Sequence, residues 1–211
     1  LLVGGTGQYV WGVLQGFHAP QVPPNPSLRA LLEAQAEKEG KEALWQRLQE
    51  VDSTAAGRIY YQNVRRVIRA LEVYCETGIP FSQAQWRETP PYRSLVIGLT
   101  LERPSLYEYI DRRVEAMVQK GWPREVGRLL EKGYSAELSS MSSLGYREMA
   151  AYVRWELPLE EAVSRIKTAT HRFGRHQYAW FRPKDPRIHW LHADGNKFVD
   201  ASIRIVSGFL R

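Results

Sequence analysis

The chain has almost no cysteine, and this excludes two kinds of architecture. Cys75 is the single cysteine among 211 residues, so neither an intrachain disulfide nor a metal site with several cysteine ligands can form. No apolar run approaches the ~20 residues that a membrane-spanning helix needs, and no signal-peptide pattern opens the chain. We therefore expect a protein of the reducing cytoplasm with no membrane partner.

Side-chain patterns that indicate hydrolytic or metal-dependent catalysis are missing as well. The histidines do not have metal-ligand spacing with acidic residues, and no Ser-His-Asp or Cys-His arrangement is evident. A glycine turn at residues 4–7 resembles a phosphate-binding helix start, but it lacks the Gly-Lys-Ser/Thr of a P-loop. A tight turn from a strand into a helix is the better interpretation.

Positive charge, in contrast, is in excess. Lysine and arginine number 29 against 23 acidic residues, which gives a formal net charge of +6. Such a balance suits a polyanionic partner, because each basic side chain that meets a phosphate releases condensed counterions. Many proteins are basic without binding one, so the positions of the arginines carry more information.

The hydrophobic pattern predicts an α/β fold with an all-helical segment inserted in it. Residues 94–100 and 187–191 are predicted strands, and residues 1–3 are predicted to end a buried strand. Helices are predicted at about residues 8–14, 25–36, 41–50, 63–76, 104–120, 123–132, 146–154 and 158–181. Because a lone strand cannot be stable, we expect sheet partners upstream of residue 1 and hence a truncated protein.

Three domain segments follow from this pattern and from a proline-rich stretch at residues 18–26. They are a first part of the core domain at 1–20, a helical insertion domain at 21–91 and a second part of the core at 92–211.

Arginines are concentrated on two of the predicted helices. Arg65, Arg66 and Arg69 occupy little more than one turn, where their charges repel unless water or anions lie between them. A solvated face balanced by Glu72 and Glu76 is the alternative, and both interpretations stay open.

The long helix predicted at 158–181 carries four arginines spaced 7, 3 and 7 apart, namely Arg165, Arg172, Arg175 and Arg182. Aromatic residues interleave with them, as suits RNA with unpaired bases. An ordinary amphipathic helix is the alternative, and for Phe173 and Trp180 we favour packing in the core. Arg113 lies on the helix that follows the strand predicted at residues 94–100. It is as compatible with clamping a diphosphate as with an ion pair.

In order along the chain, four motifs resemble those of bacterial tRNA dimethylallyltransferases. They are residues 2–9 (LVGGTGQY), residues 65–74 (RRVIRALEVY) with 77–80 (TGIP), residues 144–148 (LGYRE) and residues 175–182 (RHQYAWFR). The resemblance covers essentially the whole chain. It implies a P-loop-kinase-like core, incomplete here at its N-terminus, with an all-helical insertion domain.

The resemblance also implies an activity. The family transfers dimethylallyl from dimethylallyl diphosphate to the exocyclic amine of the adenosine 3′ of the anticodon, and Mg²⁺ assists the departure of pyrophosphate. An allylic diphosphate ionises readily once its charge is stabilised, and the target base must leave its stack. The expected partners are a tRNA anticodon stem-loop and dimethylallyl diphosphate, and the expected state is a monomer.

Residue by residue, the resemblance assigns Arg113 to the prenyl diphosphate. It assigns to tRNA binding Thr6, Arg29, Arg65, Arg66, Arg69, Ser142, Ser143, Gly145, Tyr146, Arg147, Arg175, His176, Gln177 and Arg182. The family's nucleotide-binding-type P-loop and its general base, an aspartate, would lie upstream of residue 1. We therefore assign no catalytic residue within the chain and expect no prenyl transfer by this polypeptide alone.

Three other functions are kept as hypotheses. One is a non-catalytic RNA-binding fragment, and another is an adenylate isopentenyltransferase, whose free nucleotide substrate needs fewer basic side chains. The third is a structural helical module, which would have no affinity for RNA at low salt.

Overall fold

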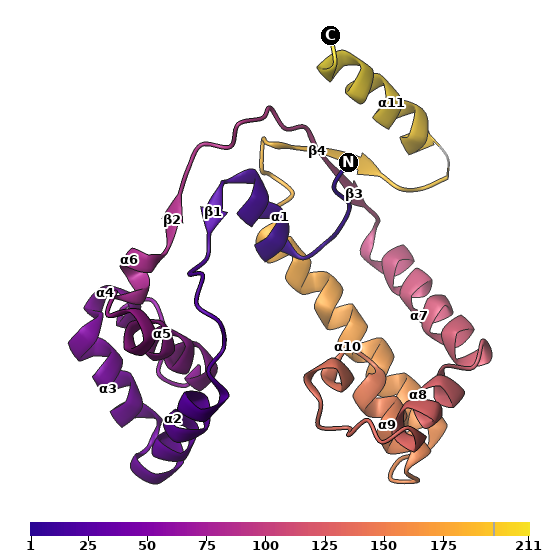
Figure 1. Ribbon diagram of the computed structural model, residues 1–211. Coiled ribbons are helices and arrows are strands. Elements are labelled where there is room, and N and C mark those ends of the chain that lie inside the picture. Colours follow the sequence, from indigo (N-terminus) through magenta and orange to yellow (C-terminus); the bar gives the residue numbers. More distant parts are fainter. Residues whose placement is uncertain (196) are drawn as a thin grey trace. The chain divides into compact units, whose positions relative to one another are not determined.

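The computed structural model describes residues 1–195 and 197–211 and shows a largely helical α/β chain (Figure 1). Two compact units are formed, one by Leu1–Gly4 with Gln8–Arg93 and the other by Gly5–Gly7 with Ser94–Arg211. Within the described part, no helix has the length and apolar character needed to cross a membrane.

The first unit contains most of α1 and seven further elements. They are α1 (Gly7–Leu14), β1 (Phe17–His18), α2 (Pro26–Glu39), α3 (Lys41–Val51), α4 (Ser53–Ala56), α5 (Val64–Thr77), α6 (Phe81–Ala84) and β2 (Trp86–Arg87). The second unit contains β3 (Val96–Thr100), α7 (Arg103–Gln119), α8 (Trp122–Glu131), a 3-10 turn (Ser139–Ser142), α9 (Tyr146–Val153), α10 (Leu159–Trp180), β4 (Ile188–His192) and α11 (Lys197–Phe209).

A helical bundle forms most of the first unit, and its longer helices begin and end at capping residues. The Asn25 side chain accepts a hydrogen bond from the Leu28 amide at 3.0 Å, and Pro26 at the first helical position needs no partner for an N–H. At the end of α5, Gly78 takes the left-handed conformation with φ 70°. The core is lined by apolar residues of α2, α3, α4 and α5, including Leu32, Leu44, Leu48, Ala55, Val67 and Leu71. These helices confirm the prediction for α2, α3 and α5.

Two short helices that the sequence pattern does not predict are joined by one buried carboxylate. Asp52 caps α4 by accepting the Ala55 amide at 2.9 Å, and it also accepts the amide and hydroxyl of Ser82, both at 2.7 Å. A helix of four residues is too short to show a hydrophobic period, so α4 and α6 were not predictable in this way.

The two strands predicted at residues 94–100 and 187–191 form a parallel pair in the second unit. Val96 lies opposite Ile188 and Thr100 opposite His192, in register along both strands. A Cβ placed on Gly98 would lie 2.7 Å from the ring of Trp190, so glycine lets this ring lie over the strand. The predicted α/β class is confirmed for this pair.

The strand predicted at residues 1–3 is wrong. Those residues are exposed and form no strand in the described part of the chain. Three further elements were not predicted: β1 and β2, which have only two residues each, and α11.

Helices α7 to α10 enclose a second core. It is lined by buried apolar side chains from all four helices, including Val114, Trp122, Val126, Met149, Ala162 and Ile166. In Figure 1, α9 lies beside the N-terminal half of α10, and α8 packs against α9. The four predicted helices in this region are confirmed within two residues at each end.

Candidate nucleic-acid interface

Two of the predicted RNA-binding arginines are held by a buried carboxylate. Glu72 of α5 is fully buried, and Arg29 binds it bidentately at 2.7 and 2.8 Å. Arg69 donates to the same carboxylate at 2.6 Å and to the carbonyl of Val22 at 2.9 Å. The alternative that Glu72 belongs to a solvated helix face is therefore wrong. Asn25 and Arg29 come from the start of α2, 47 and 43 residues away, and helical periodicity does not reveal these two partners.

The pKa of Glu72 follows from the hydrogen bonds that its carboxylate accepts. Burial alone raises the pKa of the carboxyl, but hydrogen bonds from Arg29, the Asn25 amide and Arg69 outweigh burial and lower the pKa to about 2. Glu72 thus stays ionised, and the same contacts raise the pKa of Arg29. Arg29 and Arg69 act in joining α2 to α5, which leaves their predicted RNA contacts untested.

Arg65 and Arg66 differ from these two. Both side chains are exposed on the first turn of α5, and neither has a side-chain hydrogen bond or ion pair within residues 1–195 and 197–211. Exposed guanidinium groups without an acidic partner are suited to binding anions. They are the part of the predicted arginine cluster that stays available to a ligand.

Thr6 is brought close to another predicted stretch, the end of α10. A Cβ on Gly5 would lie 2.6 Å from Nε2 of Gln177, and one on Gly7 would lie 2.3 Å from the Trp180 side chain. Side chains at these two positions would displace the turn, so the glycines are needed for close packing. The turn thereby presents the exposed Thr6 beside α10.

Some basic side chains of α10 are paired with side chains of α7, and others are not, among the described residues. Three polar pairs one turn apart join the helices: Arg175 with Tyr107 (2.7 Å), His171 with Asp111 (2.8 Å) and Lys167 with Glu115 (2.6 Å). Tyr107 also stacks on His171, with ring centroids 4.0 Å apart. Arg165 is paired with Glu161. Arg175 is therefore oriented by Tyr107 while remaining exposed.

Other side chains of α10 remain exposed. Arg172 and His176 have no side-chain partner in the described part of the chain. Phe173 and Trp180 are about half exposed, at 51% and 48%, so the interpretation that they pack in the core is wrong. Exposed flat side chains beside a cation are suited to stacking on unpaired bases.

Arg182 lies beyond the end of α10, which stops at Trp180. It is exposed near Asp185, whose pKa is lowered to about 2 chiefly by hydrogen bonds from Arg187, with a smaller contribution from Arg182. It therefore does not share a helical face with Arg165, Arg172 and Arg175.

The segment at residues 142–147 opens α9 and is shaped by Trp122. Gly145 has φ 90°, and a Cβ there would lie 2.2 Å from the indole ring. The next residue, Tyr146, packs its ring edgewise on Trp122 and donates to Glu125 at 2.5 Å, which raises the pKa of the phenol. Ser142, Ser143 and Arg147 are exposed. Gly145 and Tyr146 thus have packing roles that the sequence pattern did not indicate.

Arg113 is exposed on α7 and has no ion-pair partner in the described residues. The ion-pair alternative is therefore not seen there, and the assignment to a diphosphate stays a prediction. Its neighbour Arg112 lies over the ring of Tyr109, 4.7 Å from the centroid.

Comparisons with known proteins identify the family. A model of the family described as IPP transferase matches residues 1–184. The chain belongs to the IPP transferase family. A tRNA dimethylallyltransferase of Roseiflexus castenholzii is 54% identical over 206 residues, which is 98% of this chain and 67% of that protein. A tRNA dimethylallyltransferase of Dehalococcoides mccartyi is 44% identical over 210 residues, which is 100% of this chain and 64% of that protein.

Solved structures of the IPP transferase family agree. The full-length tRNA isopentenylpyrophosphate transferase of Bacillus halodurans has a TM-score of 0.60 and 35% identity, covering 98% of this chain and 65% of that one. A eukaryotic dimethylallyltransferase described as acting on tRNA has a TM-score of 0.74 at 21% identity, which shows the fold alone. The chain thus spans about two thirds of the length of these family members or less. The predicted family is confirmed, and the individual site residues remain predictions.

Proposed function

We propose that this chain acts in the transfer of a dimethylallyl group from dimethylallyl diphosphate to tRNA. The acceptor is the exocyclic amine of the adenosine 3′ of the anticodon, and the protein acts as a cytoplasmic monomer. The observation that carries the proposal is sequence similarity. Over nearly its whole length, the chain is about 50% identical to proteins named tRNA dimethylallyltransferase.

The exposed cations support an RNA substrate. Arg65, Arg66, Arg147 and Arg172 are exposed, and none has a side-chain partner among the described residues. Such groups bind phosphates without the cost of breaking an existing ion pair. The half-exposed Phe173 and Trp180 supply flat surfaces for a base that has left its stack. In this proposal the cations position the stem-loop, and Thr6, beside Gln177, lies near the reacting adenosine.

Mg²⁺ is proposed as the cofactor of the reaction, where it would neutralise the departing pyrophosphate. Among the residues described, no group of three or more His, Cys, Asp or Glu side chains comes together to hold a metal ion. The described residues therefore form no metal site of their own, and their proposed part is the binding of RNA and, through Arg113, of the diphosphate.

The activity is tested in a protein that carries this chain at the length of its curated relatives. Dimethylallyl diphosphate, Mg²⁺ and an anticodon stem-loop should yield the prenylated nucleoside, measured by mass spectrometry of digested RNA. A product from free AMP but not from the stem-loop would indicate an adenylate isopentenyltransferase instead. Salt-sensitive stem-loop binding without product would indicate a non-catalytic RNA-binding protein.

Removal of Arg65 and Arg66 is expected to weaken binding of the stem-loop. Replacing both with alanine should lower affinity roughly tenfold or more at 0.1 M salt, and it should reduce the slope of log affinity against log salt by about 2, because two phosphate contacts are lost. The 211-residue chain and a fluorescent stem-loop suffice for this titration. Lys41→Ala with Arg58→Ala removes the same charge from exposed positions of the same unit. Equal losses in both double variants would contradict a local contact.

Replacement of Arg113 should act on the prenyl donor and leave tRNA binding unchanged. Loss of a charge-assisted hydrogen bond of about 1.5–3 kcal/mol predicts a KM for dimethylallyl diphosphate raised roughly 10- to 150-fold in Arg113→Ala. Steady-state kinetics with varied donor measures it. Arg112→Ala, which removes the neighbouring charge, is the control, and a similar KM change in both would contradict a specific role.

A further inference from the structure

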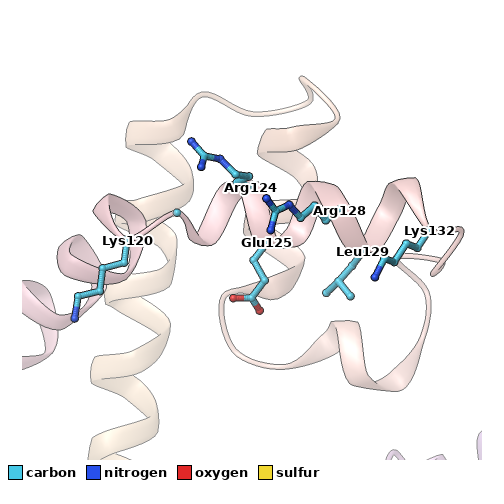
Figure 2. A pocket seen from close by; sticks show the side chains of 7 residues that line it. Lys120, Arg124, Glu125, Arg128, Leu129 and Lys132 are labelled. Carbon is cyan, nitrogen blue, oxygen red and sulfur yellow. The ribbon is translucent and has the colours of Figure 1, made fainter.

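Four basic residues of the second unit line a surface hollow. None of the residues predicted to bind RNA belongs to this lining. The hollow has a volume of about 460 Å³ and is lined by Lys120, Gly121, Arg124, Glu125, Arg128, Leu129 and Lys132. Figure 2 shows these side chains along α8 and at its two ends. We call this surface the α8 hollow.

The four cations line the same hollow because of their spacing. Lys120 caps the end of α7, Arg124 and Arg128 are one turn apart on α8, and Lys132 caps the end of α8. Four residues advance a helix by about 6 Å, so Arg124 and Arg128 project in nearly the same direction. The opposite side of α8 is buried through Trp122 and Val126. The cations therefore cannot turn into the core and are held at the surface.

The charge of the α8 hollow is not neutralised. All four basic side chains are exposed, and none has a hydrogen bond or ion pair from its side chain within residues 1–195 and 197–211. The one acid in the lining, Glu125, accepts a hydrogen bond from Tyr146. The lining thus carries four positive charges against one negative charge, and a ligand with several anionic groups would match it.

A contact with Tyr146 links the α8 hollow to the predicted RNA-binding surface. Tyr146 belongs to the stretch at residues 142–147 that the family resemblance assigns to tRNA, and its hydroxyl binds the Glu125 carboxylate at 2.5 Å. The hollow has no aromatic side chain for stacking and no amide side chain for reading base edges. It is therefore suited to the sugar–phosphate backbone and unsuited to unpaired bases.

We propose that the α8 hollow binds the phosphate backbone of the double-stranded stem of the RNA substrate, outside the loop that holds the target base. This inference rests on the proposed function and extends its footprint. In a duplex, contacts to the backbone fix the position of the protein without reading the sequence. The hollow would thus set how the RNA lies while the residues nearer Thr6 receive the adenosine.

The test compares Arg124→Ala/Arg128→Ala with the unchanged chain on two RNAs, an anticodon arm with its full stem and the same loop closed by a short stem. With the full arm we expect roughly tenfold weaker binding or more at 0.1 M salt and a salt slope smaller by about 2. With the short stem the two proteins should bind alike. Arg124→Lys/Arg128→Lys keeps the charge and should keep the slope.

Further measurements separate the possible failures. Lys38→Ala/Lys41→Ala removes two exposed charges in the other unit and should leave the slope unchanged, and thermal unfolding checks that each variant is folded.

If Arg124→Ala/Arg128→Ala binds the full arm normally while Arg65→Ala/Arg66→Ala does not, the proposal for the hollow is overturned and the proposed function stands. If the unchanged chain fails to bind either RNA, the proposed function itself is contradicted. A double variant that loses binding to polyglutamate or to anionic vesicles, but not to RNA, would assign the hollow to another partner.

Discussion

Replacing Glu72 with alanine is expected to lower the free energy of unfolding of the first unit by about 3–5 kcal/mol, the cost of breaking a buried ion pair. The carboxylate is fully buried and accepts hydrogen bonds from Arg29, Arg69 and the Asn25 amide. Its removal leaves two guanidinium groups facing each other in a partly desolvated space. The bundle would then lose the attachment of α2 to α5.

Hydrogen exchange is the measurement that resolves this effect, because it reports on each unit separately. Amides in the buried turns of α5 should exchange much faster in Glu72→Ala, while those of α10 keep their rates. Glu76→Ala is the matched control, since Glu76 is exposed and, among the described residues, accepts one hydrogen bond, from the Asn25 side chain. A Glu72→Ala chain with protection in α5 equal to that of the control would contradict the structural role.

The pH dependence of stability follows from the same group. Glu72 has a pKa of about 2 in the folded chain against an ordinary value of 4.5, so the unfolded chain binds the proton more tightly. The stability that Glu72 contributes is therefore complete above pH 4.5 and is lost as the pH falls towards 2. Glu72→Gln should abolish this part of the pH dependence, measured by urea unfolding between pH 2.5 and 6. A variant as acid-sensitive as the unchanged chain would assign that sensitivity to other groups.

Most helices with a hydrophobic period over several turns could be predicted from the sequence, although α11 was missed, and elements held by a few tertiary contacts could not be predicted. Helices α5 and α10 were predicted because their apolar stripes repeat over several turns and their ends carry capping residues or proline. β1 and β2 pair over two residues each, and α4 and α6 depend on the hydrogen bonds of Asp52. Such elements depend on tertiary contacts between distant parts of the chain.

The same distinction applies to the candidate site. The arginine cluster of α5 was visible as a sequence motif, but its three arginines have different environments. Arg69 is bound to Glu72, whereas Arg65 and Arg66 are exposed. The three polar pairs between α7 and α10 join side chains that are 52 to 68 residues apart in the sequence. Because one charged residue on a helix resembles another in sequence, only the structure separates the arginines that hold the fold from those available to RNA.

Gly145→Ala is expected to destabilise the second unit by about 2–5 kcal/mol, although the family resemblance assigns Gly145 to RNA binding. A left-handed backbone costs a non-glycine residue roughly 1–3 kcal/mol. Gly145 has φ 90°, and its new Cβ would lie 2.2 Å from the ring of Trp122, which is itself buried in the core. Displacing a packed ring adds roughly 1–3 kcal/mol.

Gly133→Ala separates the two contributions. Gly133 has φ 83°, but a Cβ there has no atom within 4 Å, so this variant reports the backbone cost alone. The excess destabilisation of Gly145→Ala, measured by urea unfolding, should fall when Trp122 is replaced by leucine in the same chain, because the smaller side chain makes room for the methyl group. Stem-loop affinity measured at low temperature, where the variant stays folded, should change little. A Gly145→Ala chain that is as stable as Gly133→Ala but binds the stem-loop poorly would place Gly145 in the RNA interface instead.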